Sequence, residues 1–143
     1  ADGRGLVFTG RLDAEDMAWL ADRTVDGTPV LPAAGIVELA LSAAHRAGAQ
    51  HVAELVLEQD LPVSGPTDLQ LLVGAPDGAG GSSLAVYSRA AGTWGTAWTR
   101  NAVGALSATG CGEVAGLPSW PPNGASPVPV EDLYPRLAER GHV

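Results

Sequence analysis

The hydrophobic pattern changes from a helical period to a period of two after residue 47, and this change limits the possible fold more than any other feature. Over residues 34–47 the polar side chains recur at steps of four and three, and so form one narrow stripe on a helix: Glu38, Ser42 and His45. Apolar residues fill the rest of the helical surface, which predicts a helix that is mostly buried in the protein. After this helix the period falls to two, which is typical of β-strands.

The strands are predicted near residues 52–63, 68–74, 83–89 and 94–106, with turn-forming residues between them at 64–67, 75–83 and 90–92. The segment GLVFTGRL, residues 5–12, reads as one further strand ahead of the helix. The order strand, buried helix and then several antiparallel strands predicts an α+β protein, with an antiparallel sheet wrapped around one central helix.

The last part of the chain has a different composition. From residue 110 to 130 it is rich in Gly, Pro and Ser, which is typical of a linker or of a segment that crosses the surface. Residues 131–140 return to a helical pattern that Pro135 interrupts. We therefore expect one domain over residues 1–109, and a linker with the beginning of a further unit over residues 110–143.

Charge and cysteine content exclude several classes of function. The net charge is −8, the chain has no Lys, and its eight arginines form no basic run, so nucleic-acid binding is not expected. The single Cys111 cannot form an internal disulfide, which favours a reducing compartment. No segment is apolar enough over a bilayer's thickness to span a membrane, and no secretion signal precedes the first strand. We expect a cytoplasmic protein without membrane contact.

One motif points to a family. The order W-L-x-D-x-x-V-x-G-x-x-x-x-P, followed by VELAL at residues 37–41, resembles the dehydratase domains of modular type I polyketide synthases. The motif stands here as Trp19, Leu20, Asp22, Arg23, Val25, Gly27 and Pro32. Other segments resemble the family in the same order: LVFTGRL, ELVLEQDLPV at 54–63, LQLLVGAPDG at 69–78 and WTRNAVGAL at 98–106.

The resemblance implies a double hotdog fold, of which this chain would be the N-terminal half. Members of the family remove water from a β-hydroxyacyl group that hangs on the phosphopantetheine arm of an acyl carrier protein. The family's catalytic base is a histidine in this motif, and an aspartate in the second half helps the hydroxyl group to leave. Neighbouring polyketide synthase domains and the acyl carrier protein would be the partners. No directly bound cofactor and no metal are expected.

The sequence departs from the family pattern at the positions that carry the chemistry. Arg23 stands where the family has its catalytic histidine, Asn101 where a histidine is often found, and Ala33 where a glycine usually follows the motif proline. The chain ends before a counterpart of the aspartate. These departures predict no catalytic residue and a degenerate site formed by Arg23, Gly27, Pro32 and Asn101.

The leading hypothesis is therefore a catalytically inactive, truncated dehydratase-like domain with a structural, dimerisation or docking role. An unpaired hotdog half would leave a sheet edge exposed, so we expect a homodimer or burial against another domain. The alternative is half of a dehydratase-family enzyme that acts on carrier-bound β-hydroxyacyl groups and is completed by another chain or domain. A third hypothesis is a free-standing acyl-binding hotdog.

Arg23 is a poor proton acceptor, because an arginine side chain stays protonated in proteins. It either binds an anion, such as a phosphopantetheine phosphate or a carboxylate, or pairs with Asp22 or Asp26, or faces solvent. Other candidate groups have simpler structural interpretations. Asp22 is interpreted as a turn residue, Glu38 as a hydrogen-bonding group on the helix, and the glycine-rich segment 77–83 as a hairpin loop. His45 and His51 do not have the spacing of a metal pair, and Cys111 has no histidine motif nearby that would make it a nucleophile.

Overall fold

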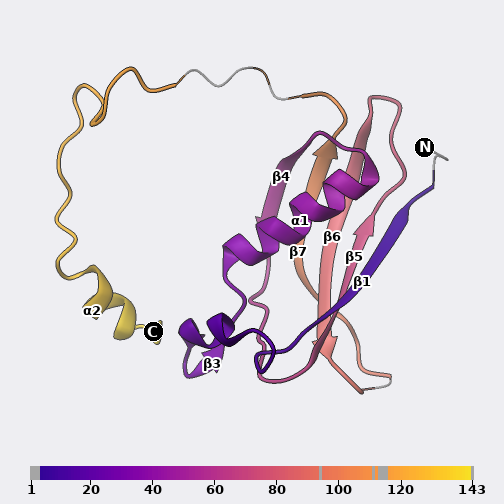
Figure 1. Ribbon diagram of the computed structural model, residues 1–143, viewed down its shortest axis with the longest axis horizontal. Helices are drawn as coiled ribbons and strands as arrows, with labels where there is room; N and C mark the ends of the chain where they lie inside the picture. The colour runs from indigo at the N-terminus through magenta and orange to yellow at the C-terminus, as the bar shows by residue number, and fades with distance from the viewer. Residues whose placement is uncertain (1–3, 94, 111, 113–115, 143) are drawn as a thin grey trace.

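The computed structural model describes residues 4–93, 95–110, 112 and 116–142. Its main element is a five-stranded sheet in the order β1-β5-β6-β7-β4, in which every neighbouring pair is antiparallel. The strands are β1 (Leu6–Leu12), β4 (His51–Leu57), β5 (Thr67–Val73), β6 (Gly81–Ala90) and β7 (Thr99–Ser107). The helix α1 (Ala33–Ala47) lies across one face of this sheet (Figure 1). The predicted antiparallel sheet packed on one helix is confirmed.

The sheet face that meets α1 carries the core. Alternate residues of β5 and β6 are buried there, including Leu69, Leu71, Leu84 and Val86, while the residues between them point to the other face. This alternation is the one that the period of two predicts, because successive side chains of a strand point to opposite faces.

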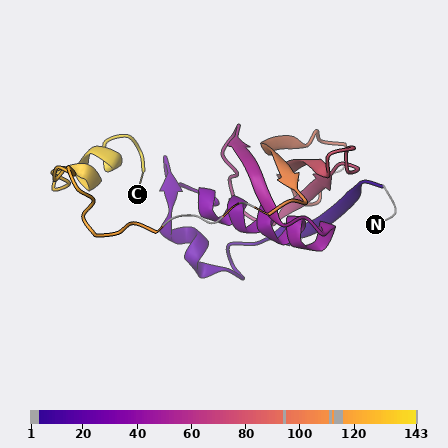
Figure 2. The same cartoon turned by 90° about the horizontal axis from the view of Figure 1, so that it is seen from above.

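The helix α1 is less buried than its sequence predicts. Its side toward the sheet contributes Ile36, Ala40 and Ala43 to the core, but Val37 and Leu41 on other sides are 42% and 45% exposed. The sheet covers α1 from one side only, as the view in Figure 2 shows, so an apolar residue on its far side meets no other element. The expectation of a mostly buried helix was wrong for this reason.

The predicted strand over residues 52–63 is also shorter than expected. Pairing of β4 with β7 ends at Leu57, and the chain then turns into a loop. That loop is nevertheless part of the core, because Leu61 and Val63 are fully buried and hydrogen bond to the segment before α1. Pro62 between them forms an isolated antiparallel β-bridge with Val30, so this part of the loop pairs with the segment before α1 and no longer with β7.

The segment before α1 contains a 3-10 helix, η1 (Ala18–Asp22), and a small hairpin of β2 (Thr24–Val25) and β3 (Thr28–Pro29). Asp26 and Gly27 form the turn of this hairpin with positive φ angles of 49° and 75°. The turn therefore explains why a glycine stands at this motif position. Trp19, the first residue of the motif, lies in η1 and is 51% exposed, so it is not part of the core.

In the C-terminal segment after β7, the described residues 108–110, 112 and 116–132 form no helix or strand, and α2 (Leu133–Ala138) follows them (Figure 1). Pro135 lies in the first turn of α2, where its missing N–H has no intrahelical partner to lose. The segment returns to the hairpin, where the N–H of Asp26 donates to the carbonyl oxygen of Gly141 at 2.9 Å and Val25 forms a β-bridge with His142.

In the part of the chain that the structure describes, no helix is both long and apolar enough to cross a bilayer. Cys111, which the sequence singles out, lies outside the described residues, and so does residue 94, where one strand was predicted to begin.

Candidate functional site

The motif residues bring Arg23 next to the beginning of α1. Arg23 follows η1 with an extended backbone, the hairpin then reverses the chain, and the N–H of Val30 donates back to the carbonyl oxygen of Arg23 at 3.2 Å. Pro32 is the N-cap of α1 with φ −59°, a value that fits the fixed ring of proline. Gly27 at the turn and Pro32 at the cap thus place the Arg23 side chain close to the first turn of the helix.

A cavity of about 290 Å³ lies at this position, and we call it the Arg23 pocket. The beginning of α1 forms one wall, and the end of β4 with the loop after it forms the other. The lining residues are Arg23, Leu31, Ala33, Ile36, Leu57, Glu58, Gln59, Asp60 and Leu61. The pocket therefore combines one cation, two carboxylates and an apolar wall.

Arg23 is half-buried and has no ion-pair partner among the residues that the structure describes. The expected pairing with Asp22 or Asp26 is thus not formed. Instead, Asp26 uses its backbone N–H to hold Gly141, and its carboxylate lies against that glycine. The Arg23 guanidinium is left available to a ligand or to water.

Asn101 does not line the pocket, but it fixes the loop that does. It is 0% exposed, and its Nδ2 donates to the carbonyl oxygen of Asp60 at 2.9 Å. Its own carbonyl oxygen accepts hydrogen bonds from the N–H groups of Glu58 and Gln59. Its Oδ1 has no partner among the described residues. Arg23 and Asn101, which the resemblance selects together, are therefore connected only through residues 58–60.

Sequence reasoning missed the two acidic residues of this loop. Glu58 accepts two hydrogen bonds from Arg100, at 2.6 Å from Nε and 3.0 Å from Nη2. The hydrogen bond and the charge of Glu58 raise the pKa of Arg100 above its ordinary value. Asp60 makes no ion pair with a described residue. The signal in the sequence was the acidic EQD triplet directly after an apolar strand.

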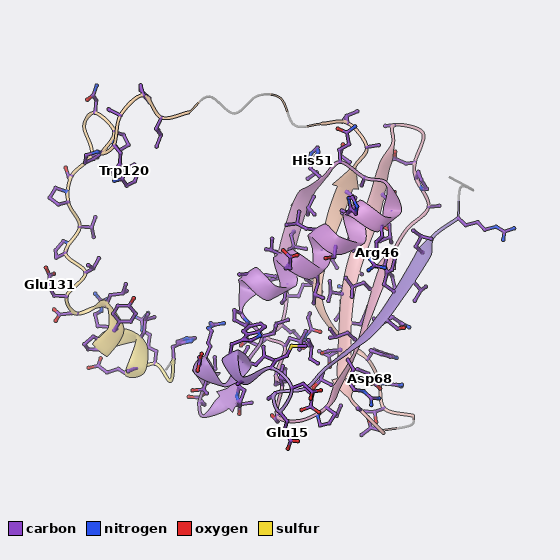
Figure 3. The ribbon with its side chains drawn as sticks, in the orientation of Figure 1. Glu15, Arg46, His51, Asp68, Trp120 and Glu131 are labelled. Carbon is purple, nitrogen blue, oxygen red and sulfur yellow. The ribbon has the colours of Figure 1, made fainter. Side chains whose placement is uncertain are left out.

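The remaining candidates lie apart from this pocket. Glu38 and His45 are exposed on α1, so Glu38 is not a hydrogen-bonding group inside a buried helix. His51 is the first residue of β4 (Figure 3). The glycine-rich segment forms a hairpin loop, as expected, in which Asp77 Oδ1 accepts from the N–H groups of Ala79 and Gly81. No group of three His, Cys, Asp or Glu residues in the described part of the chain could hold a metal ion.

Similarity to known proteins covers nearly the whole chain. The family described as polyketide synthase dehydratase domain matches residues 1–89. The mycoketide-CoA synthase of Mycobacterium tuberculosis is 46% identical over 140 residues, which are 96% of this chain and 3% of that protein.

Two solved structures share the fold over 99% of this chain, each with a TM-score of 0.81. One comes from work on dehydratase substrate selection for the borrelidin and fluvirucin polyketide synthases, at 38% identity, and this chain covers 50% of it. The other is the dehydratase domain from the terminal module of the rifamycin polyketide synthase, at 34% identity and 53% coverage. The chain thus spans about half the length of the solved proteins and a small part of the curated synthase.

Proposed function

The chain belongs to the polyketide synthase dehydratase family and folds as a single hotdog half, and we propose from this premise that it is a catalytically inactive dehydratase-like unit. Its role within a modular polyketide synthase would be structural, through dimerisation or through docking of neighbouring domains and of the acyl carrier protein. The substrate of a working relative would be presented on the phosphopantetheine arm of that carrier.

One observation carries the proposal: the motif position of the family's base is held by Arg23. Removal of an α-proton needs an acceptor whose pKa lies near the working pH. An arginine guanidinium keeps its proton at any working pH and so cannot accept another. Among the described residues that line the Arg23 pocket, no histidine could take over this step.

The sheet edges support a role in assembly. β1 and β4 are the two edge strands of the sheet in the described part of the chain, so each has one side without a strand partner. Unpaired strand edges favour association with another chain or domain. Light scattering coupled to size exclusion should therefore report the mass of a dimer, and a stable monomer would contradict the dimerisation role.

A second candidate function is favoured by the coverage of the solved structures. Because the chain matches about half of each dehydratase, it could form half of an enzyme that acts on carrier-bound β-hydroxyacyl groups. Another chain or domain would then complete the site and supply the missing base.

The experiment that separates the two candidates measures water loss from a 3-hydroxyacyl group on an acyl carrier protein by mass spectrometry. The chain is assayed alone and fused to the second half of the rifamycin dehydratase domain. We expect no product in either case, because Arg23 cannot accept the proton. Arg23→His in the fused protein should create activity, and Arg46→His, at an exposed arginine of α1, should not.

Activity of the fused protein with Arg23 intact would refute the inactive assignment and support the second candidate. Absence of activity in the Arg23→His fusion, with folding verified by circular dichroism, would mean that more than the base has been lost from this site.

A further inference from the structure

We propose that the Arg23 pocket binds the carboxylate of a short aliphatic acid, with Arg23 and the first turn of α1 as the anion-binding groups. The inference rests on the proposed function, because it assigns a ligand to a pocket in which proton abstraction has been lost. It concerns a ligand that binds and is not converted, so it can be tested without any assay of turnover.

The first support is an available cation. Arg23 is charged at every physiological pH, is half-buried, and has no carboxylate partner among the described residues. A half-buried guanidinium without a partner gains more from an anion than an exposed arginine does, because the surrounding protein weakens the screening by water. Hydrogen bonds between a guanidinium and a carboxylate are also about twice as strong as bonds between neutral groups.

The second support comes from the beginning of α1, a helix of 15 residues. The N–H groups of Gly35 and Ile36 both donate to the carbonyl oxygen of Pro32, whereas Ala33 and Ala34 come before the first residue that can donate within the helix. Pro32 at the N-cap provides no side-chain hydrogen bond to them. Ala33 lines the pocket, so the positive end of the helix faces the same space as Arg23.

The third support is the apolar part of the wall, which selects the kind of anion. Leu31, Ile36 and Leu61 line the pocket and belong to the buried core, so their positions are fixed. An aliphatic chain attached to the carboxylate would cover this surface and gain the free energy of apolar burial. A phosphate has no such chain and carries more negative charge, so it fits the pocket less well.

Asp60 is the one group in the pocket that opposes an anion. The carboxylate of Glu58 is compensated by Arg100 through two hydrogen bonds, but Asp60 has no ion-pair partner among the described residues. It therefore repels a bound carboxylate and competes with it for Arg23. The proposal therefore predicts the direction of one change: removal of the Asp60 charge should increase the affinity of the pocket for a carboxylate.

The test is a titration of the ¹⁵N-labelled chain with sodium butanoate, followed by the backbone amide resonances of Ala33 and Ala34. Butanamide, which has the same chain without the charge, and inorganic phosphate are the comparison ligands. We expect saturable shifts with butanoate that are absent or much weaker with the other two.

Three variants sharpen the test. Arg23→Gln should weaken butanoate binding by about tenfold or more, since it removes a charged hydrogen-bonding partner. Asp60→Asn should strengthen it several-fold. Arg46→Gln is the matched control, because Arg46 is an exposed arginine of α1 that lies away from the first turn of this helix (Figure 3). The affinity of the Arg46→Gln variant for butanoate should not change.

Several results would overturn the proposal: no saturable shift with butanoate, equal affinity in the Arg23→Gln variant when its spectrum shows a folded protein, or preferential binding of phosphate. Binding only in the Asp60→Asn variant would also overturn it for the natural chain, and would show that Asp60 occupies Arg23 in solution. Water loss in the dehydratase assay would refute the inactive assignment alone and would leave these binding results unaffected.

Discussion

Two regions of this chain both contain large apolar residues, but only one of them buries such residues in a core. In the body, residues 5–109, apolar side chains from α1, β5, β6 and β7 and from the 58–66 loop form one buried cluster. In the arm, residues 116–142, six large apolar side chains are exposed and only Leu137 is half-buried among the described ones: the exposed residues are Leu117, Trp120, Val128, Val130, Leu133 and Tyr134. Trp120 has the largest exposed fraction, 82%, and stands away from the sheet (Figure 3).

The difference shows that periodicity, and not apolar content, decides burial. In β5 and β6 of the body the large apolar residues alternate onto one side of the strand, and α1 covers that side. The prolines and glycines of the arm interrupt both periods, so its apolar residues share no common face. The arm is held to the body at the β2–β3 hairpin, through Asp26 and Gly141 and through the bridge of Val25 with His142.

The largest difference between the two regions is expected when a leucine is replaced by alanine in each of them. Leu61→Ala should destabilise the protein by about 2–5 kcal/mol, because it removes a fully buried side chain from a packed core. Leu117→Ala in the arm, where the leucine is 64% exposed, should change the free energy of unfolding by less than about 0.5 kcal/mol. Urea unfolding followed by circular dichroism measures both, and similar values would contradict the division into body and arm.

A pair of glycines sharpens the comparison at the level of the backbone. A Cβ atom on Gly104 in β7 would collide with the carbonyl oxygen of Glu54 in the neighbouring strand β4. Gly104→Ala should therefore cost about 1–3 kcal/mol, as overpacking against a backbone usually does. A Cβ on Gly116 in the arm would meet nothing within 4 Å, so Gly116→Ala serves as the control and should leave the unfolding midpoint unchanged. Equal loss of stability in the two variants would argue against the packing of β4 on β7.

The smallest effect on global stability is expected where the arm meets the body. Gly141 has a φ of 79°, and a Cβ there would collide with the carboxylate of Asp26. Gly141→Ala should therefore detach the end of α2 from the hairpin while it changes the free energy of global unfolding by less than about 1 kcal/mol. Hydrogen exchange followed by mass spectrometry should show faster exchange in residues 133–142 and at Asp26, with the sheet unchanged. Faster exchange throughout β5 and β6 would mean that the arm supports the body.

Local sequence was sufficient for the regular elements of the body. The polar stripe of α1, the alternation of β5 and the turn residues between β5 and β6 each express a period or a turn preference within a few residues. The bounds of α1 and β5 lie within one residue of the predicted ones, and the predicted turn is found, although β6 already begins at Gly81. The order of the motif residues was also enough to identify the family, which the similarity to known dehydratases confirms.

The site depended on contacts that no local pattern encodes. The end of β4 at Leu57, the hydrogen bond from Asn101 to Asp60 across 41 residues, and the pairing of Glu58 with Arg100 all join segments far apart in the chain. The exposure of Val37 and Leu41 has the same origin, because the sequence of a helix does not encode how many of its sides the sheet will cover. Sequence alone therefore determined α1, β1 and β5 and the identity of the residue at the base position. The tertiary structure decided which groups surround that residue, because the contacts of a side chain depend on the packing of distant elements.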